Sequence, residues 1–384
     1  MKKYNFIIKL LGCISLVILF ISVMSFKIND TRVNHQEYSN RKSIRLKGIL
    51  RKNKVNGLIL INGNSNSSHP EVITNTPSFT SVKIKATHFF PIASLQKGLT
   101  GIAVYYLIKT KKINLDTPLS RFFPNLKNSN NIRIEQLMTH TSGICDKYKE
   151  TNSILKKEKA RERFIFKDFY INSKHTWHYA SSNYGILSAI IRLETKGTYY
   201  KYINKQILIP DKLTGVKSFA QISNINDVTL PQKQDRKKIT MLLNLLRVGK
   251  LFPQLSFLNI SELINLISWR HLCKGLSENL GAGDFLATPN SYWDFFNKTI
   301  LDNPQIISYF DNEAQKVKPH YFGGYYFKNK YILADGTLNK FSCCSVAANY
   351  KNKRTIMIFT NNISFKKFRK LQKKIYNLYF RKLQ

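Results

Sequence analysis

Two short apolar segments of strand type lie near opposite ends of this chain, and they constrain its fold more than any other feature. Residues 57–63 read GLILING and residues 354–362 read RTIMIFTNN, and apolar runs of this length closed by Gly or Asn predict buried strands. The segment VKIKATHFF at 82–90 is expected to continue the opening sheet. Helical patterns dominate the middle of the chain. We therefore expect an α+β fold, with an antiparallel sheet completed by both termini and flanked by helices, and an inserted, mainly helical lobe.

The last segment predicts an amphipathic helix. Its apolar residues recur at steps of three and four, and lysines occupy the opposite face. The apolar positions are Phe365, Phe368, Leu371, Ile375 and Leu378, and the lysines are Lys366, Lys367, Lys370, Lys373 and Lys374. Such a lysine face is most simply a solvated surface, and it is also compatible with an anionic surface.

The amino terminus carries a membrane signal. Residues 6–26 read FIIKLLGCISLVILFISVMSF, interrupted only by Lys9, which is long enough to cross a hydrocarbon core of about 30 Å as a helix. We therefore predict a transmembrane anchor or signal peptide at 1–26, a polar tether at 27–43 and a folded domain at 44–384. The expected location is the cell membrane, with a single-pass anchor and the domain outside. The alternative is secretion after cleavage near Val23 and Ser25.

The charge predicts an anionic partner without identifying it. A net charge of +39 and a pI near 10.0 attract polyanions, although lysine is abundant throughout the chain and the excess is also explained by a general bias. No zinc-finger spacing or arginine-rich recognition helix is present in the sequence, so no nucleic acid is expected as a partner. The five cysteines do not form a disulfide framework, because adjacent Cys343 and Cys344 point to opposite faces of a strand.

The stretch PIASLQKGLTGIAVYYLI contains Ser94 at a predicted helix start and Lys97 three residues later. One helical turn places both side chains on the same face. A serine hydroxyl needs a base to become a nucleophile, and a buried lysine with a lowered pKa can be that base. S-x-x-K alone is a weak signal, since a capping serine followed by a solvated lysine gives the same pattern.

A second motif supplies the context. In WHYASSNYGILSAII, Tyr179 and Ser181 stand two residues apart before a helical run. Together the motifs resemble the serine beta-lactamase family of the class C kind, with its carboxypeptidase and esterase relatives, which carry S-x-x-K, then Y-x-N or Y-x-S, then a K-T-G or H-x-G strand. INLDTPLSRFFPN, IRIEQLMTHTSGI and LGAGDFLATPNSYWDFF also resemble family segments in the expected order. The resemblance covers about residues 44–362.

The resemblance implies a role for each matching residue. Ser94 is expected to be acylated, Lys97 to accept its proton, and Tyr179 to relay the proton to the leaving group. Ser181 replaces the commoner asparagine and is expected to hydrogen-bond to Lys97 or to substrate. The family requires neither a metal nor a cofactor. His140 and Ser142, in THTSG, are expected to be architectural rather than catalytic.

The third motif departs from the family pattern. In YILADGTLNKF, Ala334, Asp335 and Gly336 stand where K-T-G or H-x-G is expected, so the cation or imidazole is missing. Gly336 still permits a close approach of substrate, and the amide of Thr337 is expected to pair with that of Ser94 as an oxyanion hole. By strand alternation, the side chain of Asp335 is expected to point away from the cleft. A substrate carboxylate would therefore lack its usual partner.

These observations leave three readings. The first is a serine acyl-hydrolase of the cell envelope that acts on D-alanyl groups, with the D-alanyl ester of teichoic or lipoteichoic acid as the preferred substrate and partner. The second is a D-alanyl-D-alanine carboxypeptidase or beta-lactamase-like enzyme that acts on a peptidoglycan stem peptide. The third is a non-catalytic envelope-binding protein that has kept the fold.

Overall fold

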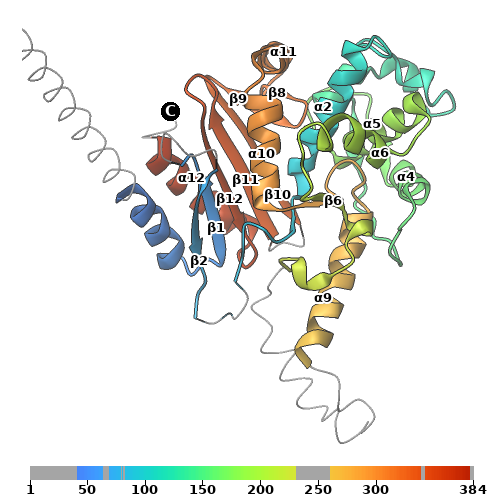
Figure 1. The fold of residues 1–384 in the computed structure, drawn as a ribbon. Helices are drawn as coiled ribbons and strands as arrows, with labels where there is room; N and C mark the ends of the chain where they lie inside the picture. Colours follow the sequence, from blue (N-terminus) through green and yellow to red (C-terminus); the bar gives the residue numbers. More distant parts are fainter. Residues whose placement is uncertain are drawn as a thin grey trace, which may run out of the picture.

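An antiparallel sheet of seven strands forms the framework of the molecule (Figure 1). The computed structural model describes residues 41–63, 69–78, 80, 83–230, 260–338 and 342–380. The hairpin near the amino terminus pairs with the last strand, which confirms the predicted α+β fold with a sheet completed from both ends of the chain. In their order across the sheet, the strands are β2 (Glu71–Asn75), β1 (Gly57–Ile61), β12 (Arg354–Thr360), β11 (Ser342–Asn349), β10 (Tyr331–Leu338), β9 (Tyr325–Lys328) and β8 (Tyr321–Phe322).

Helices cover both faces of this sheet, and further helices form the lobe inserted between β2 and β8 (Figure 1). A helix over residues 41–52 and the terminal helix α12 cover one face, where they share one apolar cluster with the strands. The larger cluster joins the other face to the lobe. Besides the helix over 41–52, the described α-helices are α2 (Gln96–Lys109), α3 (Ile134–Met138), α4 (Glu158–Lys167), α5 (Ser181–Thr195), α6 (Tyr199–Ile203), α9 (Ile260–Ser277), α10 (Pro289–Asp294), α11 (Pro304–Gln315) and α12 (Phe365–Phe380).

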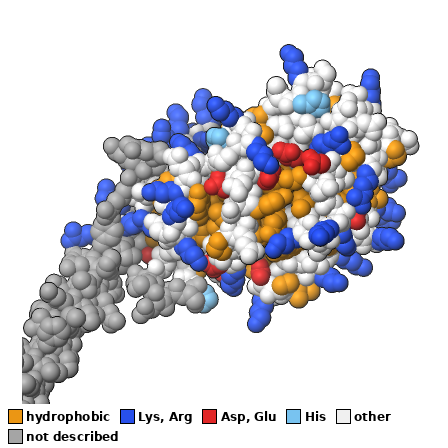
Figure 2. Space-filling view, turned by 90° about the horizontal axis from the view of Figure 1, so that it is seen from above, with side chains coloured by type: hydrophobic (Ala, Val, Ile, Leu, Met, Phe, Trp, Pro, Cys, Tyr) orange, Lys and Arg blue, Asp and Glu red, His pale blue; other side chains and the backbone are white. Residues whose placement is uncertain are grey.

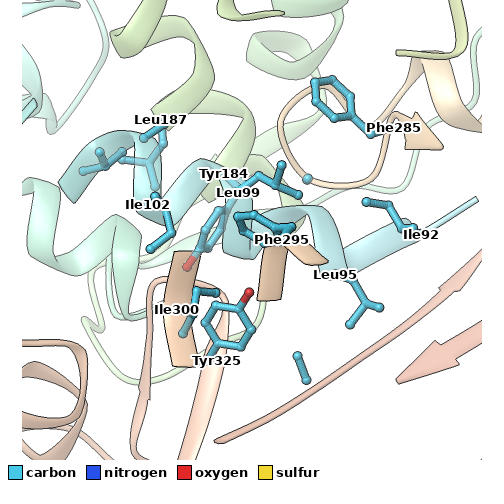
Figure 3. Packing of buried hydrophobic residues seen from close by; sticks show 14 of the residues in the cluster. Ile92, Leu95, Leu99, Ile102, Tyr184, Leu187, Phe285, Phe295, Ile300 and Tyr325 are labelled. Carbon is cyan, nitrogen blue, oxygen red and sulfur yellow. The ribbon is translucent and has the colours of Figure 1, made fainter. Parts of the chain in front are cut away.

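Helix α2 is the central element of the larger cluster. Its residue Leu99 lies in the same cluster as Tyr184 of α5 and Tyr325 of β9 (Figure 3). Two glycines let α2 approach the sheet closely, because a Cβ at Gly98 would lie 2.0 Å from the Tyr325 hydroxyl, and one at Gly101 would lie 2.2 Å from a backbone oxygen between β8 and β9. The start of α2 is thereby held at a fixed distance from the sheet.

Three predictions from the sequence need correction or remain outside the described residues. The segment 82–90 does not continue the main sheet: only Phe90–Pro91 forms a strand, β3, in a separate sheet of order β3-β7-β6 with β7 (Phe285–Ala287) and β6 (Val216–Ser218). Residues 41–43, at the end of the predicted tether, belong to a helix that continues to residue 52. The apolar segment 6–26 lies outside the described residues, and among those that are described no helix has the length and apolarity to cross a bilayer.

The cysteines follow the predicted alternation. Cys343 belongs to the cluster under α12, whereas Cys344 belongs to the cluster around α2. The four cysteines in the described part of the chain, which also include Cys145 and Cys273, are buried free thiols. The core of this fold is therefore built by apolar packing.

Candidate active site

Ser94 lies on a short turn that leads directly into α2. This turn, η1 (Ala93–Leu95), is a single 3-10 turn, and Ala93 has a φ of +46°. A left-handed conformation costs an alanine about 1–2 kcal/mol, so the surrounding packing must hold it in place. Because Ser94 lies in the first turn of the helical segment, its amide has no acceptor within the helix. The amide and the hydroxyl of Ser94 are thus both available at the start of α2.

Lys97, the predicted base, is buried next to Ser94. Its side chain is 0% exposed, and its Nζ donates to Ser94 Oγ at 3.0 Å and to the carbonyl oxygen of Ala282 at 3.1 Å. Burial lowers the pKa of Lys97 from 10.5 to about 7, and the negative charge of Asp146 opposes part of this shift. A substantial fraction of Lys97 is therefore neutral near neutral pH, as a general base requires.

Tyr179 completes a three-residue cluster around the nucleophile. Its hydroxyl donates to Ser94 Oγ at 2.9 Å, and its ring centre lies 4.9 Å from Lys97 Nζ. Burial raises the pKa of Tyr179 above its ordinary value of 10.0, so the side chain remains a neutral phenol. Lys97 and Tyr179, from the first and second motifs, thus both lie within hydrogen-bond distance of Ser94 Oγ.

Ser181 does not make the contact that was expected with Lys97. Within the described residues its hydroxyl has no hydrogen-bond partner, whereas its backbone amide donates to Asp146 Oδ2 at 2.7 Å. The amide of Ser182 donates to the other oxygen of the same carboxylate at 3.1 Å. Asp146 therefore caps the positive end of α5, where it also acts on the pKa of Lys97. Asp146 could not be identified from the sequence, since no local pattern links it to a helix that begins 35 positions later.

The imidazole ring of His140 packs against the ring of Tyr179. The two ring centres are 4.4 Å apart, and the His140 Nδ1 accepts the amide of Ala180 at 3.3 Å. Burial, with Lys97 nearby, lowers the pKa of His140 well below its ordinary value, so the ring is neutral. Ser142 Oγ donates to Asn183 on α5 at 2.6 Å. These contacts give both residues of the THTSG segment a positioning role, with no contact to Ser94.

The predicted third motif runs along β10 beside the nucleophile. A Cβ at Gly336 would lie 2.9 Å from the Ser94 amide nitrogen, so glycine alone permits this approach. Strand β9 pairs with β10 only as far as Leu333, which leaves the backbone of 334–338 unpaired on the side of the cleft. The segment that carries the Thr337 amide therefore lies against the turn that carries the Ser94 amide. This is the arrangement that the predicted oxyanion hole needs.

The side chains of β10 alternate as the sequence predicts. Ala334 is buried in the cluster around α2, whereas Asp335 forms an ion pair with Arg369 on α12, across the opposite face of the sheet. Thr337 lies on that opposite face too, within 3.5 Å of the Cys343 sulfur. No cation of β10 faces the nucleophile, and Asp335 does not take its place.

A buried polar network fixes the turn that orients Lys97, and the sequence analysis did not identify it. Asp284 is fully buried, accepts the Gln96 side-chain amide at 2.7 Å and pairs with Arg161 of α4 at 2.7 Å. Because Asp284 follows Ala282 in the glycine-rich turn, this network holds the carbonyl that binds Lys97 Nζ. The sequence signal that could have identified Asp284 is its position as a charged residue in the otherwise apolar turn GAGDF.

A cavity of about 240 Å³ opens beside the cluster of Ser94, Lys97 and Tyr179, and we call it the acidic pocket. It is bordered by Ser181 and by Ala282, the residue whose carbonyl binds Lys97. Four carboxylates and one lysine also line it: Asp146, Glu150, Asp168, Glu278 and Lys149. Its lining is therefore negative, whereas the chain as a whole carries a charge of +39. No group of residues suited to hold a metal ion occurs in the described part of the chain.

The arrangement is equipped for acyl transfer. Neutral Lys97 can take the proton of Ser94 as Oγ attacks a carbonyl carbon, and the unpaired amides beside Gly336 can stabilise the resulting oxyanion. The Tyr179 hydroxyl, 2.9 Å from Oγ, is placed to deliver a proton to the leaving oxygen or nitrogen. Water can then attack the acyl-enzyme by the same route in reverse.

Solved structures share this fold. The crystal structure of FmtA from Staphylococcus aureus superposes with a TM-score of 0.66 at 19% identity, covering 89% of this chain and 87% of FmtA. The D-amino acid amidase of Ochrobactrum anthropi SV3, complexed with D-phenylalanine, gives a TM-score of 0.67 at 14% identity and covers 89% and 99% of the two chains.

Sequence comparison gives the family. Protein Flp of Staphylococcus aureus (strain MRSA252) is 32% identical over 152 residues, which is 37% of this chain and 30% of Flp. PbpX of Bacillus subtilis (strain 168), named as a penicillin-binding protein, is 29% identical over 129 residues, or 33% and 32% of the two chains. The matched region thus spans about a third of each curated relative. The Beta-lactamase family model matches residues 74–312, more than half of the chain. Together with the Ser94 cluster, this match shows that the chain belongs to the Beta-lactamase family and is a serine hydrolase.

Proposed function

We propose that this serine hydrolase removes D-alanyl groups from ester linkage on an anionic polymer of the cell envelope, with teichoic or lipoteichoic acid as the substrate. The observation that carries the proposal is the acidic pocket beside Ser181 and Ala282. An alanyl ester carries a free ammonium two bonds from the scissile carbonyl carbon and has no carboxylate at that end. A negative pocket next to the nucleophile, with no cation on the adjacent strand, matches this charge pattern.

The carboxylates of the acidic pocket retain acceptor capacity. Glu278 accepts the amide and the hydroxyl of Thr151, at 2.7 and 3.0 Å, through the same oxygen. Asp168 accepts the amide of Lys149 at 2.7 Å. Each carboxylate offers about four lone-pair sites, so these bonds leave room for an ammonium. In a partly enclosed space, several carboxylates together attract a cation more strongly than one exposed carboxylate does.

A second concave surface supports a polymeric, anionic substrate. We call it the basic groove; its volume is about 890 Å³, and it lies between α4, the end of α5 and α6. Arg161 lines this groove and Ile165 lines the acidic pocket, one turn apart or about 6 Å along α4. A polymer of phosphodiesters could therefore contact the groove while one of its alanyl esters enters the pocket. The lysines of the groove are Lys156, Lys157, Lys159, Lys196 and Lys201, beside one carboxylate, Glu158; its two arginines, Arg161 and Arg192, form ion pairs with Asp284 and Glu162.

The reaction would proceed through an acyl-enzyme. Ser94 Oγ attacks the ester carbonyl while its proton passes to Lys97, and the C–O bond to the polymer breaks as the polymer alkoxide takes a proton through Tyr179. A water molecule then attacks the alanyl ester of Ser94 and releases alanine. The fold of the D-amino acid amidase, solved with D-phenylalanine, supports this choice, because that ligand is also an amino acid with a free ammonium.

A D-alanyl-D-alanine carboxypeptidase or beta-lactamase-like activity is the alternative that the name of PbpX favours. Its substrates carry a carboxylate next to the leaving group, on a peptidoglycan stem peptide or a penicillin. On β10 this chain offers Ala334, which is 5% exposed, where that carboxylate would need a cation. A purely binding protein would need neither the Lys97–Ser94 hydrogen bond nor a lysine pKa near 7.

The test compares D-alanine release from D-alanylated lipoteichoic acid with release from a D-Ala-D-Ala peptide, using the full-length protein and a Ser94→Ala control. We expect release from the polymer alone, and none from the control. Asp168→Asn should raise KM for the polymer several-fold, whereas Asp116→Asn, an exposed carboxylate remote from the pocket lining, should leave it unchanged. Release from the peptide alone would establish the carboxypeptidase. Release from neither, with no acylation of Ser94, would establish a binding protein.

A further inference from the structure

One face of the molecule carries positive charge without any carboxylate in its two helical segments. Residues 41–62 and 361–380 contain no Asp or Glu, although the chain as a whole has 22 of them beside 61 Lys and Arg. We define the basic face as the exposed cations of the helix over 41–52 and of α12. Its members are Arg41, Arg45, Lys47, Arg51, Lys52, Lys366, Lys367, Arg369, Lys370, Lys373 and Lys374.

The two helices form one continuous surface. Leu46 and Leu50 of the first helix share an apolar cluster with Phe368 and Leu371 of α12, and both helices lie on the same side of the sheet (Figure 1). Because their apolar sides pack inward, their cations point away from the sheet. Within the described part of the chain, only Arg369 of α12 takes part in a salt bridge, and the five lysines of that helix form none. Lysines and arginines stand out over much of the face seen in Figure 2, so the feature specific to the basic face is that its two helices carry no carboxylate.

We propose that the basic face lies on a bilayer surface of anionic lipid headgroups. The sequence before the described residues favours lipid over other polyanions: the apolar segment, residues 6–26, precedes by 14 residues a helix that is described from residue 41 and forms part of the basic face. A bilayer that holds the apolar segment would therefore meet this face of the domain first. Anionic headgroups attract clustered lysines and arginines within about one Debye length of the surface.

This placement orients the active site. Ser94 lies on the opposite side of the sheet from α12, since Gly336 contacts the nucleophile turn while its neighbour Asp335 pairs with Arg369. One helix layer of about 10 Å and the sheet itself therefore separate the nucleophile from the headgroups. The catalytic cleft would face away from the lipid, toward polymers that extend from the membrane. The inference depends only on charge and chain geometry, so it is independent of which acyl group is cleaved.

Lysine footprinting of the full-length protein tests the proposal. The protein is mixed with vesicles of phosphatidylcholine alone or of phosphatidylcholine with phosphatidylglycerol, treated briefly with an acetylating reagent, and analysed by mass spectrometry. With phosphatidylglycerol, Lys366, Lys370 and Lys373 should be acetylated at least about threefold more slowly. High salt should remove this protection. The exposed Lys112 and Lys127, on the helical lobe, are internal controls whose acetylation rate should not change.

A charge-reversed variant makes the test independent of labelling chemistry. Lys366→Glu, Lys370→Glu and Lys373→Glu together should abolish the extra vesicle binding that phosphatidylglycerol confers, whereas the same number of reversals at Lys112, Lys127 and Lys167 should not. Equal protection on both vesicles, or equal protection of the control lysines, would overturn the proposal. Protection by soluble poly(glycerol phosphate) but not by phosphatidylglycerol vesicles would also overturn it, and would assign the face to the polymer.

Discussion

Replacing Lys97, the predicted base, should make this protein more stable at neutral pH. Lys97 is fully buried, and folding lowers its pKa from 10.5 to about 7. Between these values the unfolded chain binds more protons than the folded one, so the free energy of unfolding rises with pH across that window. The difference between the two pKa values corresponds to roughly 5 kcal/mol of lost stability well below pH 7, and to roughly 4 kcal/mol at pH 7, where the folded lysine is half protonated.

Lys97→Met removes this penalty with a side chain of similar length. The variant also loses the hydrogen bonds to Ser94 Oγ and to the Ala282 carbonyl, each worth about 1 kcal/mol. The net gain at pH 7 is therefore about 2 kcal/mol. Near pH 10 the penalty on the wild-type lysine falls below about 1 kcal/mol, so the lost hydrogen bonds should leave the variant slightly less stable than the wild type. The order of stability should thus reverse with pH.

Urea denaturation followed by tryptophan fluorescence measures both effects, at neutral and at alkaline pH, and hydrolysis assays should show that Lys97→Met is inactive. The exposed Lys112→Met serves as the control, and its stability should match the wild type at both pH values. A Lys97→Met protein that is less stable than the wild type at pH 7, or a stability difference that does not change with pH, would refute the reasoning. Either result would mean that Lys97 is charged in the folded state.

Further predictions concern the chemistry and the network that supports it. kcat/KM should rise with pH through about 7 as Lys97 loses its proton, falling about tenfold per pH unit below that value, and a flat profile would contradict its role as base. Tyr179→Phe should lower kcat by about 10²–10⁴ with little change in KM, because the proton donor 2.9 Å from Ser94 is lost; unchanged kinetics would remove the phenol from the proton path. Asp284→Asn should cost about 3–5 kcal/mol in urea denaturation, since it leaves Arg161 buried without a counter-charge, and adding Arg161→Met should recover much of that loss. Raising the salt concentration should increase KM for the polymer but not for a small alanyl ester, as a titration of both substrates will show.

The sequence was sufficient to predict the residues whose spacing is local. Ser94 and Lys97 are one helical turn apart, and the alternation of a strand placed Asp335 on the face opposite the cleft. The sheet completed by both termini followed from apolar runs that are short enough to be strands. These features depend on helix and strand periodicity, which a single sequence records.

Other parts of the site depend on contacts that no local pattern encodes. Asp284 binds Gln96 across 188 positions of sequence, and Asp146 caps α5 across 35. The neutral state of Lys97 results from complete burial, which is visible only in the folded chain. Residues 82–90 were mispredicted because their alternation fits a strand, whereas Phe90 is the residue of this segment that pairs with β7.

The net positive charge of the chain and the carboxylates of the acidic pocket act on a ligand over different distances. A chain with a charge of +39 repels an isolated ammonium, yet charges more than about 8 Å from an exposed site are largely screened at physiological salt. Within that distance, the carboxylates of the acidic pocket determine the local potential. At longer range a polyanion gains from many cations at once, so the basic groove can concentrate a polymer whose individual alanyl groups the rest of the surface would repel. A free alanyl ester has no such attraction, and an unmodified polymer has no ammonium for the pocket. The proposed substrate carries both charges, so it would satisfy both surfaces, whereas a free alanyl ester or an unmodified polymer would satisfy only one of them.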